Sequence, residues 1–216
     1  MKLIILAAGD SFELNGFNKL LLKNPINKKT IIEEYIDFFN PSNVKIVLGY
    51  KAIDVMNEYP NFDYIINQDW QITGSAYSLY LALDSNPCYV VSSDLFLSKL
   101  LNKKINNTYK NFICSVNTES KRLTALNIKI KNNKVSEVYR GVSKNNDNEL
   151  INFFKITDSN ILNIWKKNCK NNPEGYVGEL LPYSTYDIHN ISLTKSDIYE
   201  INTNLDFINY LNRFND

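Results

Sequence analysis

The chain has 216 residues, 44 % of them hydrophobic and 12 % aromatic, which is enough to bury the core of one domain and excludes wholesale disorder. Lys and Arg total 24 against 23 Asp and Glu, so the strong basic excess of a nucleic-acid or anionic-membrane binder is absent. Three widely spaced cysteines and a single histidine disfavour both a disulfide framework and a Cys/His zinc site.

Short apolar runs alternate with amphipathic segments over the first 94 residues. Strands are predicted over residues 3–6, 44–48, 62–66 and 88–91, and helices over residues 31–39, 51–58 and 75–83. Thr30 and Glu33 have the spacing of a capping box at the first helix. In the third helix, Tyr77, Tyr80 and Leu81 are expected to face the sheet. The alternation predicts a parallel sheet with helices on its faces.

The pattern changes after residue 111. Consecutive strands are predicted over residues 112–116, 123–130 and 135–140, which indicates an antiparallel portion. Ile161, Ile164 and Trp165 mark a later helix, followed by a short strand at 198–201 and a closing helix at 205–214. No internal repeat or Pro/Gly linker interrupts the chain, so we expect one continuous domain.

Three features lie at the carboxyl ends of predicted parallel strands, where ligands of such sheets bind. They are the small-residue run Leu6-Ala7-Ala8-Gly9, the pair Gly49-Tyr50, and Asp94. Small residues let backbone N–H groups approach an anion or a planar base. A carboxylate at this edge suits Mg²⁺, which prefers one or two carboxylates together with substrate phosphates. Lys19 follows Gly9 by ten residues, so the loop between them is long enough to bring its ammonium back to the same edge.

The order of these features, with the segment Asn67-x-x-Trp70-x-x-Thr73-Gly74-Ser75-Ala76-Tyr77-Ser78-Leu79 and the late stretch Ile198-Tyr199-Glu200-Ile201-Asn202-Thr203, resembles the nucleotidyltransferases with a GT-A-like Rossmann fold. The last two segments look most like the bacterial CTP:phosphocholine cytidylyltransferases. The resemblance implies an α/β fold: a mixed, mainly parallel Rossmann-like sheet with helices on both faces and a small antiparallel C-terminal portion. It also implies a nucleotide-binding half at 1–105 and an acceptor-binding half at 106–216.

The resemblance also implies roles for individual residues. Lys19 would bind the nucleotide phosphates and stabilise charge during transfer. Asp94 and Asn202 would hold Mg²⁺ from two sides. Leu6, Ala7, Ala8 and Gly9 would line the base and ribose, and Thr73, Gly74 and Ser75 would help to recognise cytosine. The implied reaction is attack of a phosphomonoester or phosphonate oxygen on the α-phosphorus of CTP, with release of pyrophosphate.

The segment 174–179 contains two glycines, two carboxylates and an aromatic ring. Carboxylates beside aromatic rings suit an ammonium group. Tyr176, Glu179, Tyr183 and Tyr186 are therefore candidates for the acceptor pocket. The equally weighted alternative is a turn with exposed tyrosines.

One departure from the family pattern concerns residues 10–18, where an arginine commonly follows the glycine. This loop has no arginine and contains Asp10 and Glu13. Two like charges ~4 Å apart repel by about 1 kcal/mol in water and by more at lower dielectric. Either Lys19 and Lys23 compensate, or the acids point away from the triphosphate, or the activity is altered.

Alternatives remain for single residues and for the whole chain. Considered without the other motifs, Asp94 and Asn202 could each be a helix N-cap, and Lys19 could be a solvated surface lysine. The chain could instead be a sugar-1-phosphate nucleotidylyltransferase using another nucleotide, or a nucleotide-binding homologue without activity. The first apolar run is too short for a signal peptide and no run suits a membrane span, so we expect a cytoplasmic protein. The family resemblance allows a monomer or a homodimer. The expected partners are CTP and a small phosphorylated substrate, without nucleic acid or membrane.

Overall fold

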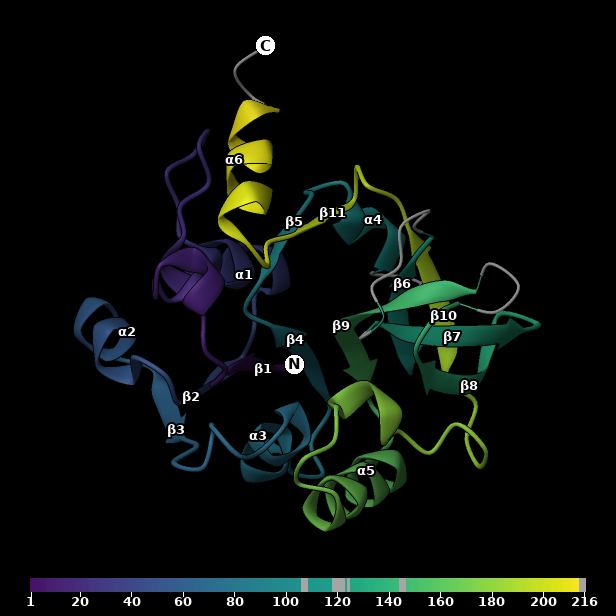
Figure 1. Ribbon diagram of the computed structural model, residues 1–216. Coiled ribbons are helices and arrows are strands. Elements are labelled where there is room, and N and C mark those ends of the chain that lie inside the picture. Colours follow the sequence, from purple (N-terminus) through teal and green to yellow (C-terminus); the bar gives the residue numbers. More distant parts are fainter. Residues whose placement is uncertain (106–108, 118–122, 124, 144–146, 214–216) are drawn as a thin grey trace.

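The computed structural model describes residues 1–105, 109–117, 123, 125–143 and 147–213. Within these residues, nine strands form one sheet in the order β3-β2-β1-β4-β9-β6-β10-β8-β7 (Figure 1). They are β1 (Lys2–Ala7), β2 (Asn43–Leu48), β3 (Asp63–Ile66), β4 (Cys88–Ser92), β6 (Phe112–Val116), β7 (Leu126–Lys131), β8 (Lys134–Arg140), β9 (Asn148–Ile156) and β10 (His189–Leu193). A separate antiparallel pair joins β5 (Leu95–Leu97) to β11 (Ile198–Glu200). The mixed α/β class predicted from the sequence is confirmed.

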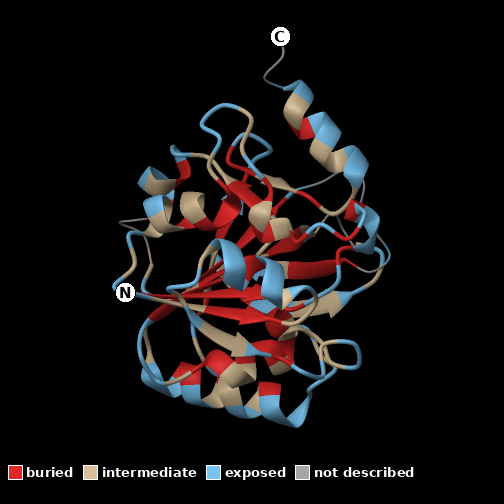
Figure 2. Cartoon of the chain, turned by 90° about the vertical axis from the view of Figure 1, so that its left-hand side faces the viewer, coloured by how far each residue is buried: buried red, intermediate tan, exposed pale blue. Residues whose placement is uncertain are grey.

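Helices pack against this sheet through two apolar clusters. They are α1 (Ile31–Phe39), α2 (Ala52–Glu58), α3 (Ser75–Ala82), α4 (Leu101–Ile105), α5 (Ser159–Asn171) and α6 (Asn204–Asn212), with short 3-10 turns η1 (Phe12–Leu14), η2 (Lys19–Leu21) and η3 (Val177–Glu179). Leu3 and Ile5 of β1 belong to the cluster that contains side chains of α1, α2, α4 and α6. Ile4 and Leu6 belong to the cluster that contains α3 and α5. Successive residues of a strand point to opposite faces, so β1 is buried on both sides. Figure 2 shows buried strands in the middle of the molecule.

A local signal in the sequence correctly predicted where α1 begins. The side chain of Thr30 accepts from the Glu33 amide and Glu33 accepts from the Thr30 amide, so the predicted capping box starts α1. The predicted sheet-facing side of α3 is wrong in part. Ala76, Leu79 and Ala82 are buried there, whereas Tyr77, Tyr80 and Leu81 are only half-buried, and of these Tyr80 packs against the core cluster. Small side chains bring this helix close to the sheet, and the larger tyrosines lie at its margin.

Antiparallel pairing extends further than the sequence predicted because β9 was not foreseen. The first four strands β3-β2-β1-β4 are parallel. β9 then pairs antiparallel with both β4 and β6, and so joins the two halves of the sheet. β10, also unforeseen, returns parallel to β6. Residue 124 of the predicted strand 123–130 and the predicted helix end at Phe214 lie outside the described residues, as does the start of the second half at 106. None of the helices in the described ranges is both long and apolar enough to cross a membrane.

Candidate active site

The loops that follow β1, β2 and β4 meet at one edge of the sheet. The Tyr50 amide donates to the Ala8 carbonyl at 3.0 Å, and the Ser93 amide donates to the Leu6 carbonyl at 3.2 Å. Gly49 lies where a Cβ would stand 2.6 Å from the Ala8 carbonyl oxygen and 2.7 Å from Trp70 Cβ. Only glycine allows this approach, so the small residues predicted to form a ligand-binding edge are tightly packed together.

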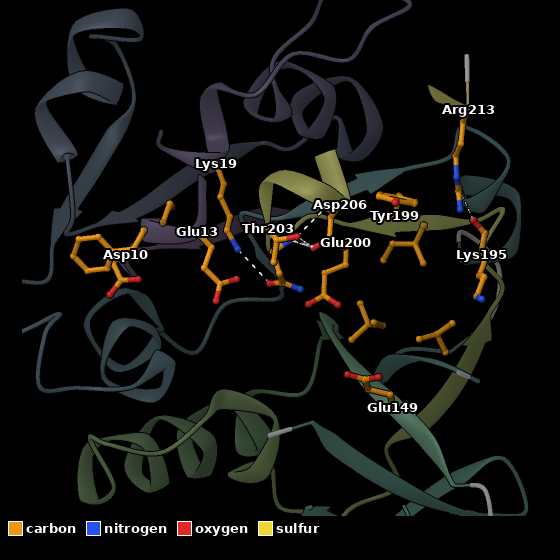
Figure 3. Close-up of a pocket in the computed structure, with 16 residues that line it drawn as sticks. Asp10, Glu13, Lys19, Glu149, Lys195, Tyr199, Glu200, Thr203, Asp206 and Arg213 are labelled. Atoms are coloured by element: carbon orange, nitrogen blue, oxygen red, sulfur yellow. Dashed lines mark hydrogen bonds between the residues drawn. The ribbon is translucent and has the colours of Figure 1, made fainter. Parts of the chain in front are cut away.

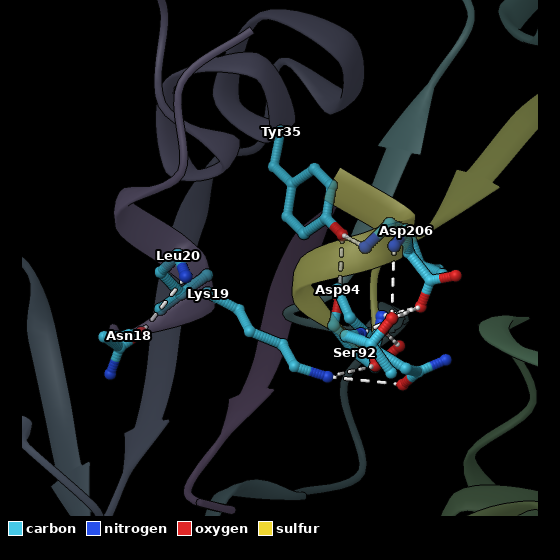
Figure 4. A network of polar contacts seen from close by, with 10 residues as sticks. Asn18, Lys19, Leu20, Tyr35, Ser92, Asp94 and Asp206 are labelled. Carbon is cyan, nitrogen blue, oxygen red and sulfur yellow. Dashed lines mark hydrogen bonds and ion pairs between the residues drawn. The ribbon is translucent and has the colours of Figure 1, made fainter. Parts of the chain in front are cut away.

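Lys19, Asp94 and Asn202 converge beside this edge. The side chain of Asn18 accepts from the Leu20 amide at 3.1 Å and so caps η2, which carries Lys19. Lys19 Nζ lies 3.5 Å from Asp94 Oδ2 and 3.3 Å from Asn202 Oδ1 (Figure 4). The side chains of Lys19 and Asp94 are only 14 % and 18 % exposed. Lys19 is therefore not a solvated surface lysine.

Neighbouring hydrogen bonds hold Asp94 in place. The Ser92 hydroxyl donates to Asp94 Oδ1 at 2.6 Å, and the Ile201 amide donates to the Asp94 carbonyl at 2.8 Å. Buried Tyr35 donates to the Ser92 carbonyl at 2.7 Å (Figure 4). Burial, with a smaller contribution from the charge of Asp94, raises the pKa of Tyr35 well above its usual value, so this hydroxyl remains a donor.

Neither Asp94 nor Asn202 serves as a helix cap. Asp94 precedes β5, which is a strand. Thr203 caps α6 by accepting from the Asp206 amide, and Asp206 Oδ2 accepts the Asn202 amide at 3.0 Å. The side chain of Asn202 is left to contact Lys19.

A cavity of about 810 Å³ opens at this cluster (Figure 3). Its lining residues are Asp10, Ser11, Phe12, Glu13, Lys19, Val116, Glu149, Ile151, Lys195, Ile198, Tyr199, Glu200, Asn202, Thr203, Asp206 and Arg213. Asp10 and Glu13 are thus part of its wall and do not point away from it, whereas Lys23 does not line it. Acidic side chains outnumber basic ones around the cavity. This excess disfavours an anion in most of the cavity and favours a group with positive charge.

The Asp94 and Asn202 oxygens fit a divalent cation. One ammonium donates to Asn202 and forms an ion pair with Asp94, so a single cation reaches both oxygens. Carboxylate and amide oxygens are ligands of Mg²⁺, which also keeps water and substrate phosphate in its shell. Within the described ranges, no three His, Cys, Asp or Glu side chains are grouped to hold a metal by themselves. A metal at this position would therefore depend on ligands supplied by substrate and water.

The predicted base-recognition residues Thr73, Gly74 and Ser75 form the turn into α3 and do not line the cavity. The Asn67 amide group donates to Thr73 Oγ1 at 3.1 Å, and that hydroxyl donates to the Asp69 carbonyl at 2.8 Å. Leu6 to Gly9 end β1 and are likewise outside the lining of the cavity. Both predicted nucleotide segments therefore border the sheet edge rather than the large cavity.

The four predicted acceptor residues do not come together around the cavity. Arg140 donates to both carboxylate oxygens of Glu179, at 2.5 and 2.6 Å, and its guanidinium lies 4.2 Å from the centre of the Tyr176 ring. The hydrogen bond to Glu179 raises the pKa of Arg140. The Tyr183 hydroxyl donates to the Gly178 carbonyl at 2.6 Å, and Tyr186 packs on the core.

The sheet separates these residues from the cavity. Ile151 of β9 lines the cavity, whereas its neighbour Leu150 points to the other face and contacts Gly178. The acceptor role of Tyr176, Glu179, Tyr183 and Tyr186 stays a prediction that this geometry does not support.

Sequence reasoning missed the cavity residues of β9, Glu149 and Ile151. The apolar stretch from Leu150 to Ile156 was a strand signal that could have found them. Tyr199 and Glu200 lay inside the late stretch Ile198 to Thr203 but were given no role.

The fold is that of nucleotidyltransferases. The CTP:phosphocholine cytidylyltransferase of Streptococcus pneumoniae matches with a TM-score of 0.74 at 21 % identity, over 98 % of each chain. The inositol-1-phosphate CTP transferase of T. maritima matches with a TM-score of 0.73 at 12 % identity, over 98 % of this chain and 95 % of that one. A UDP-glucose pyrophosphorylase complexed with UDP-glucose matches with a TM-score of 0.74 at 13 % identity, over 99 % and 98 %. No family model and no curated protein matches the sequence.

Proposed function

We propose that this chain is a Mg²⁺-dependent cytidylyltransferase that transfers CMP from CTP to a small phosphorylated or phosphonate metabolite. The observation that carries the proposal is the convergence of Lys19, Asp94 and Asn202 at the carboxyl edge of the parallel strands, beside a large cavity. The shared fold with two CTP-using enzymes supports the choice of nucleotide.

The transfer forms a bond between an oxygen of the acceptor and the α-phosphorus of CTP. It breaks the bond between that phosphorus and the bridging oxygen, and pyrophosphate leaves with the electron pair. Such chemistry depends on positioning and on charge neutralisation more than on a protein base. Lys19 would neutralise phosphate charge, and Asp94 with Asn202 would hold Mg²⁺, which supplies further positive charge to the phosphates.

The base would lie against the turn at Thr73 to Ser75, and the ribose near Leu6 to Gly9, within a nucleotide-binding half at 1–105. The second half, 106–216, would supply most of the acceptor site. Both assignments rest on the family resemblance and on the meeting of these loops at the edge of the sheet.

The charge of the cavity favours an acceptor that carries an amine or a quaternary ammonium. Glu149, Glu200 and Asp206 line it, and the ring of Tyr199 has the Arg213 guanidinium 4.2 Å from its centre. The excess of carboxylates over basic side chains attracts a cation. Phosphocholine, phosphoethanolamine, 2-aminoethylphosphonate and phosphoglutamine have this chemistry. We therefore place the acceptor here, rather than at Tyr176 and Glu179.

Incubation with CTP, Mg²⁺ and each of these acceptors should release pyrophosphate. The same assay with sugar 1-phosphates and the other nucleoside triphosphates tests the second candidate, which the likeness to a UDP-glucose pyrophosphorylase favours. CTP binding without turnover for any acceptor would favour the non-catalytic homologue. The absence of both turnover and nucleotide binding would refute the proposed function.

A further inference from the structure

The large cavity has basic side chains at an end that is remote from Lys19. Acidic side chains line its centre and the end near Lys19, whereas Lys195 and Arg213 lie at the opposite end (Figure 3). β11 runs between the two ends and rises about 3.3 Å per residue, so its first residue, Ile198, stands on the order of 10 Å from Asn202. A single phosphate group is much smaller than this span. A phosphate held at Lys19 therefore leaves Lys195 and Arg213 for a different group.

These two cations are not neutralised by the part of the chain that the structure describes. Both side chains are exposed, and no described carboxylate forms an ion pair with either of them. Arg213 Nη1 donates to the Lys195 carbonyl at 3.3 Å, which links the two residues. Two cations without a carboxylate partner on the wall of a cavity attract a negatively charged group.

An aromatic ring positions the guanidinium of Arg213. This group lies 4.2 Å from the centre of the Tyr199 ring, and the Tyr210 ring lies against Tyr199 with 5.2 Å between their centroids. A stacked guanidinium presents its remaining donors as a planar fork, which matches the two oxygens of a carboxylate. Because a cation already lies over the Tyr199 ring, a trimethylammonium group gains little by binding there.

A second cavity, of about 370 Å³, adjoins the basic end. Lys195 and Arg213 line both cavities, and the smaller one adds a third cation, Lys99. Its two carboxylates, Glu34 and Asp197, already accept hydrogen bonds from other side chains. This end of the site therefore suits an acceptor that extends away from Lys19 and ends in a negative charge.

We propose that the acceptor is a phosphorylated amino acid or a derivative of one, whose carboxylate binds Lys195 and Arg213 while its phosphate lies at Lys19. The inference rests on the proposed function and narrows its acceptor. Phosphoglutamine belongs to this class because it carries a carboxylate as well as an amine. Phosphocholine, phosphoethanolamine and 2-aminoethylphosphonate have no carboxylate and leave the basic end without a partner.

The test uses pairs of acceptors that differ by one carboxylate. Pyrophosphate release from CTP is measured with O-phosphoserine against phosphoethanolamine, and with 2-amino-4-phosphonobutyrate against 3-aminopropylphosphonate. Phosphoglutamine and its decarboxylated counterpart form a third, longer pair. In the pair that the enzyme uses best, kcat/KM should be higher for the carboxylate-bearing acceptor by about tenfold or more, the effect of one hydrogen bond between charged groups.

Variants of the two cations show whether they cause this preference. Arg213→Gln and Lys195→Gln should each reduce the ratio of the two kcat/KM values by about tenfold, through the KM for the acceptor rather than the KM for CTP. Arg213→Lys, which keeps the charge but not the planar fork, should reduce the ratio less. Lys167→Gln removes an exposed cation from α5, on the other face of the sheet, and should leave the ratio unchanged.

Equal kcat/KM values within every pair would overturn the inference and leave the proposed function intact. A ratio that neither Arg213→Gln nor Lys195→Gln changes would do the same. A rise only in the KM for CTP in these variants would assign the two cations to the triphosphate and would also overturn it. If the unaltered chain transfers CMP to none of the acceptors, the proposed function fails, and this inference with it.

Discussion

Two charged clusters, Lys19–Asp94–Asn202 and Arg140–Tyr176–Glu179, lie on opposite faces of the same sheet. In the first, one ammonium lies between two oxygens at 3.3 and 3.5 Å, and Lys19 and Asn202 border a cavity of about 810 Å³. In the second, both oxygens of Glu179 accept close hydrogen bonds from one guanidinium.

The difference separates a cluster suited to a ligand from one that satisfies itself. The contacts of Lys19 are long, so its ammonium can bind a phosphate instead. Asp94 and Asn202 can then bind a metal instead of Lys19. Both oxygens of Glu179 are already paired with Arg140, so this carboxylate attracts an ammonium ligand only weakly. Residue type alone made both clusters candidates, and only their partners distinguish them. The predictions below test this distinction.

We expect the largest loss of catalytic activity in the variant Asp94→Asn. The variant keeps the shape of the side chain but removes the negative charge that faces Lys19 and a bound cation. We expect kcat/KM to fall by at least ~10²-fold, as for a lost electrostatic stabiliser. Steady-state pyrophosphate release measures it. Asp63→Asn, at an exposed carboxylate that starts β3, is the control and should retain full activity.

Lys19→Met should also lower kcat/KM by about 10²-fold, because phosphate charge loses its nearby cation. The same change removes the ammonium that competes for the Asp94 and Asn202 oxygens. Mn²⁺, used as a probe in the absence of nucleotide, should therefore bind more tightly to this variant than to the unaltered chain. Weaker Mn²⁺ binding, measured by calorimetry or electron paramagnetic resonance, would contradict the shared-cation geometry.

Gly74→Ala tests the closure of the N-terminus of α3 by residues 173–177, whose Pro173 and Gly175 carbonyls accept from the Gly74 and Ala76 amides. The added Cβ meets the Gly175 and Glu174 carbonyl oxygens at 2.2 and 2.6 Å, and backbone atoms must shift to admit it. We expect the free energy of unfolding to fall by about 2 kcal/mol. Gly9→Ala is a matched control because a Cβ there has no neighbour within 4 Å, and its stability should stay within about 0.5 kcal/mol of the original. Denaturant unfolding compares the two.

Asp197 stabilises the β5–β11 pair that carries the site. Its buried carboxylate accepts from Lys104 at 2.7 Å and from the Thr194 amide at 2.8 Å. Burial opposes ionisation, but these bonds outweigh it and lower the pKa below its usual 3.8. A lowered folded pKa gives stability that is complete above 3.8 and is lost as pH falls through the folded value.

Asp197→Ala should therefore cost about 2 kcal/mol at neutral pH and flatten the loss of stability below pH 4. Urea titrations at several pH values measure both effects. Asp187→Ala removes a largely exposed ion pair with Lys134 and should change stability by no more than about 0.5 kcal/mol. Equal costs in the two variants would argue against a structural role for Asp197.

The smallest effect on turnover is expected from Glu179→Gln. Because Arg140 holds this carboxylate on the face opposite the cavity, kcat and the KM for the acceptor should stay within about twofold of the original. Full steady-state kinetics with an amine-bearing acceptor measure both. A large rise in the acceptor KM would restore the earlier assignment of Glu179 to the acceptor pocket and remove the contrast between the clusters.

The sequence predicted the elements whose signals are local. The apolar run at the start of the chain became a strand buried on both faces, and Thr30 with Glu33 began α1 as expected. The local apolar signal of β9 from Leu150 to Ile156 was overlooked, and its place between β4 and β6 could not be predicted because this pairing joins strands that are far apart in the chain. The sheet-facing side of α3 was missed because alanines, rather than tyrosines, allow the close approach to the sheet.

By itself, the sequence determined which residue types follow the parallel strands, because an apolar run and the small or acidic residues after it are neighbours in the chain. It therefore placed Leu6 to Gly9 and Asp94 at one edge of the sheet. Only the tertiary structure brought Lys19 to Asn202, 183 residues away, and paired Glu179 with Arg140. Such contacts depend on how strands cross over and on which face of the sheet each residue occupies. A strand that is missed in the sequence makes the prediction of both wrong.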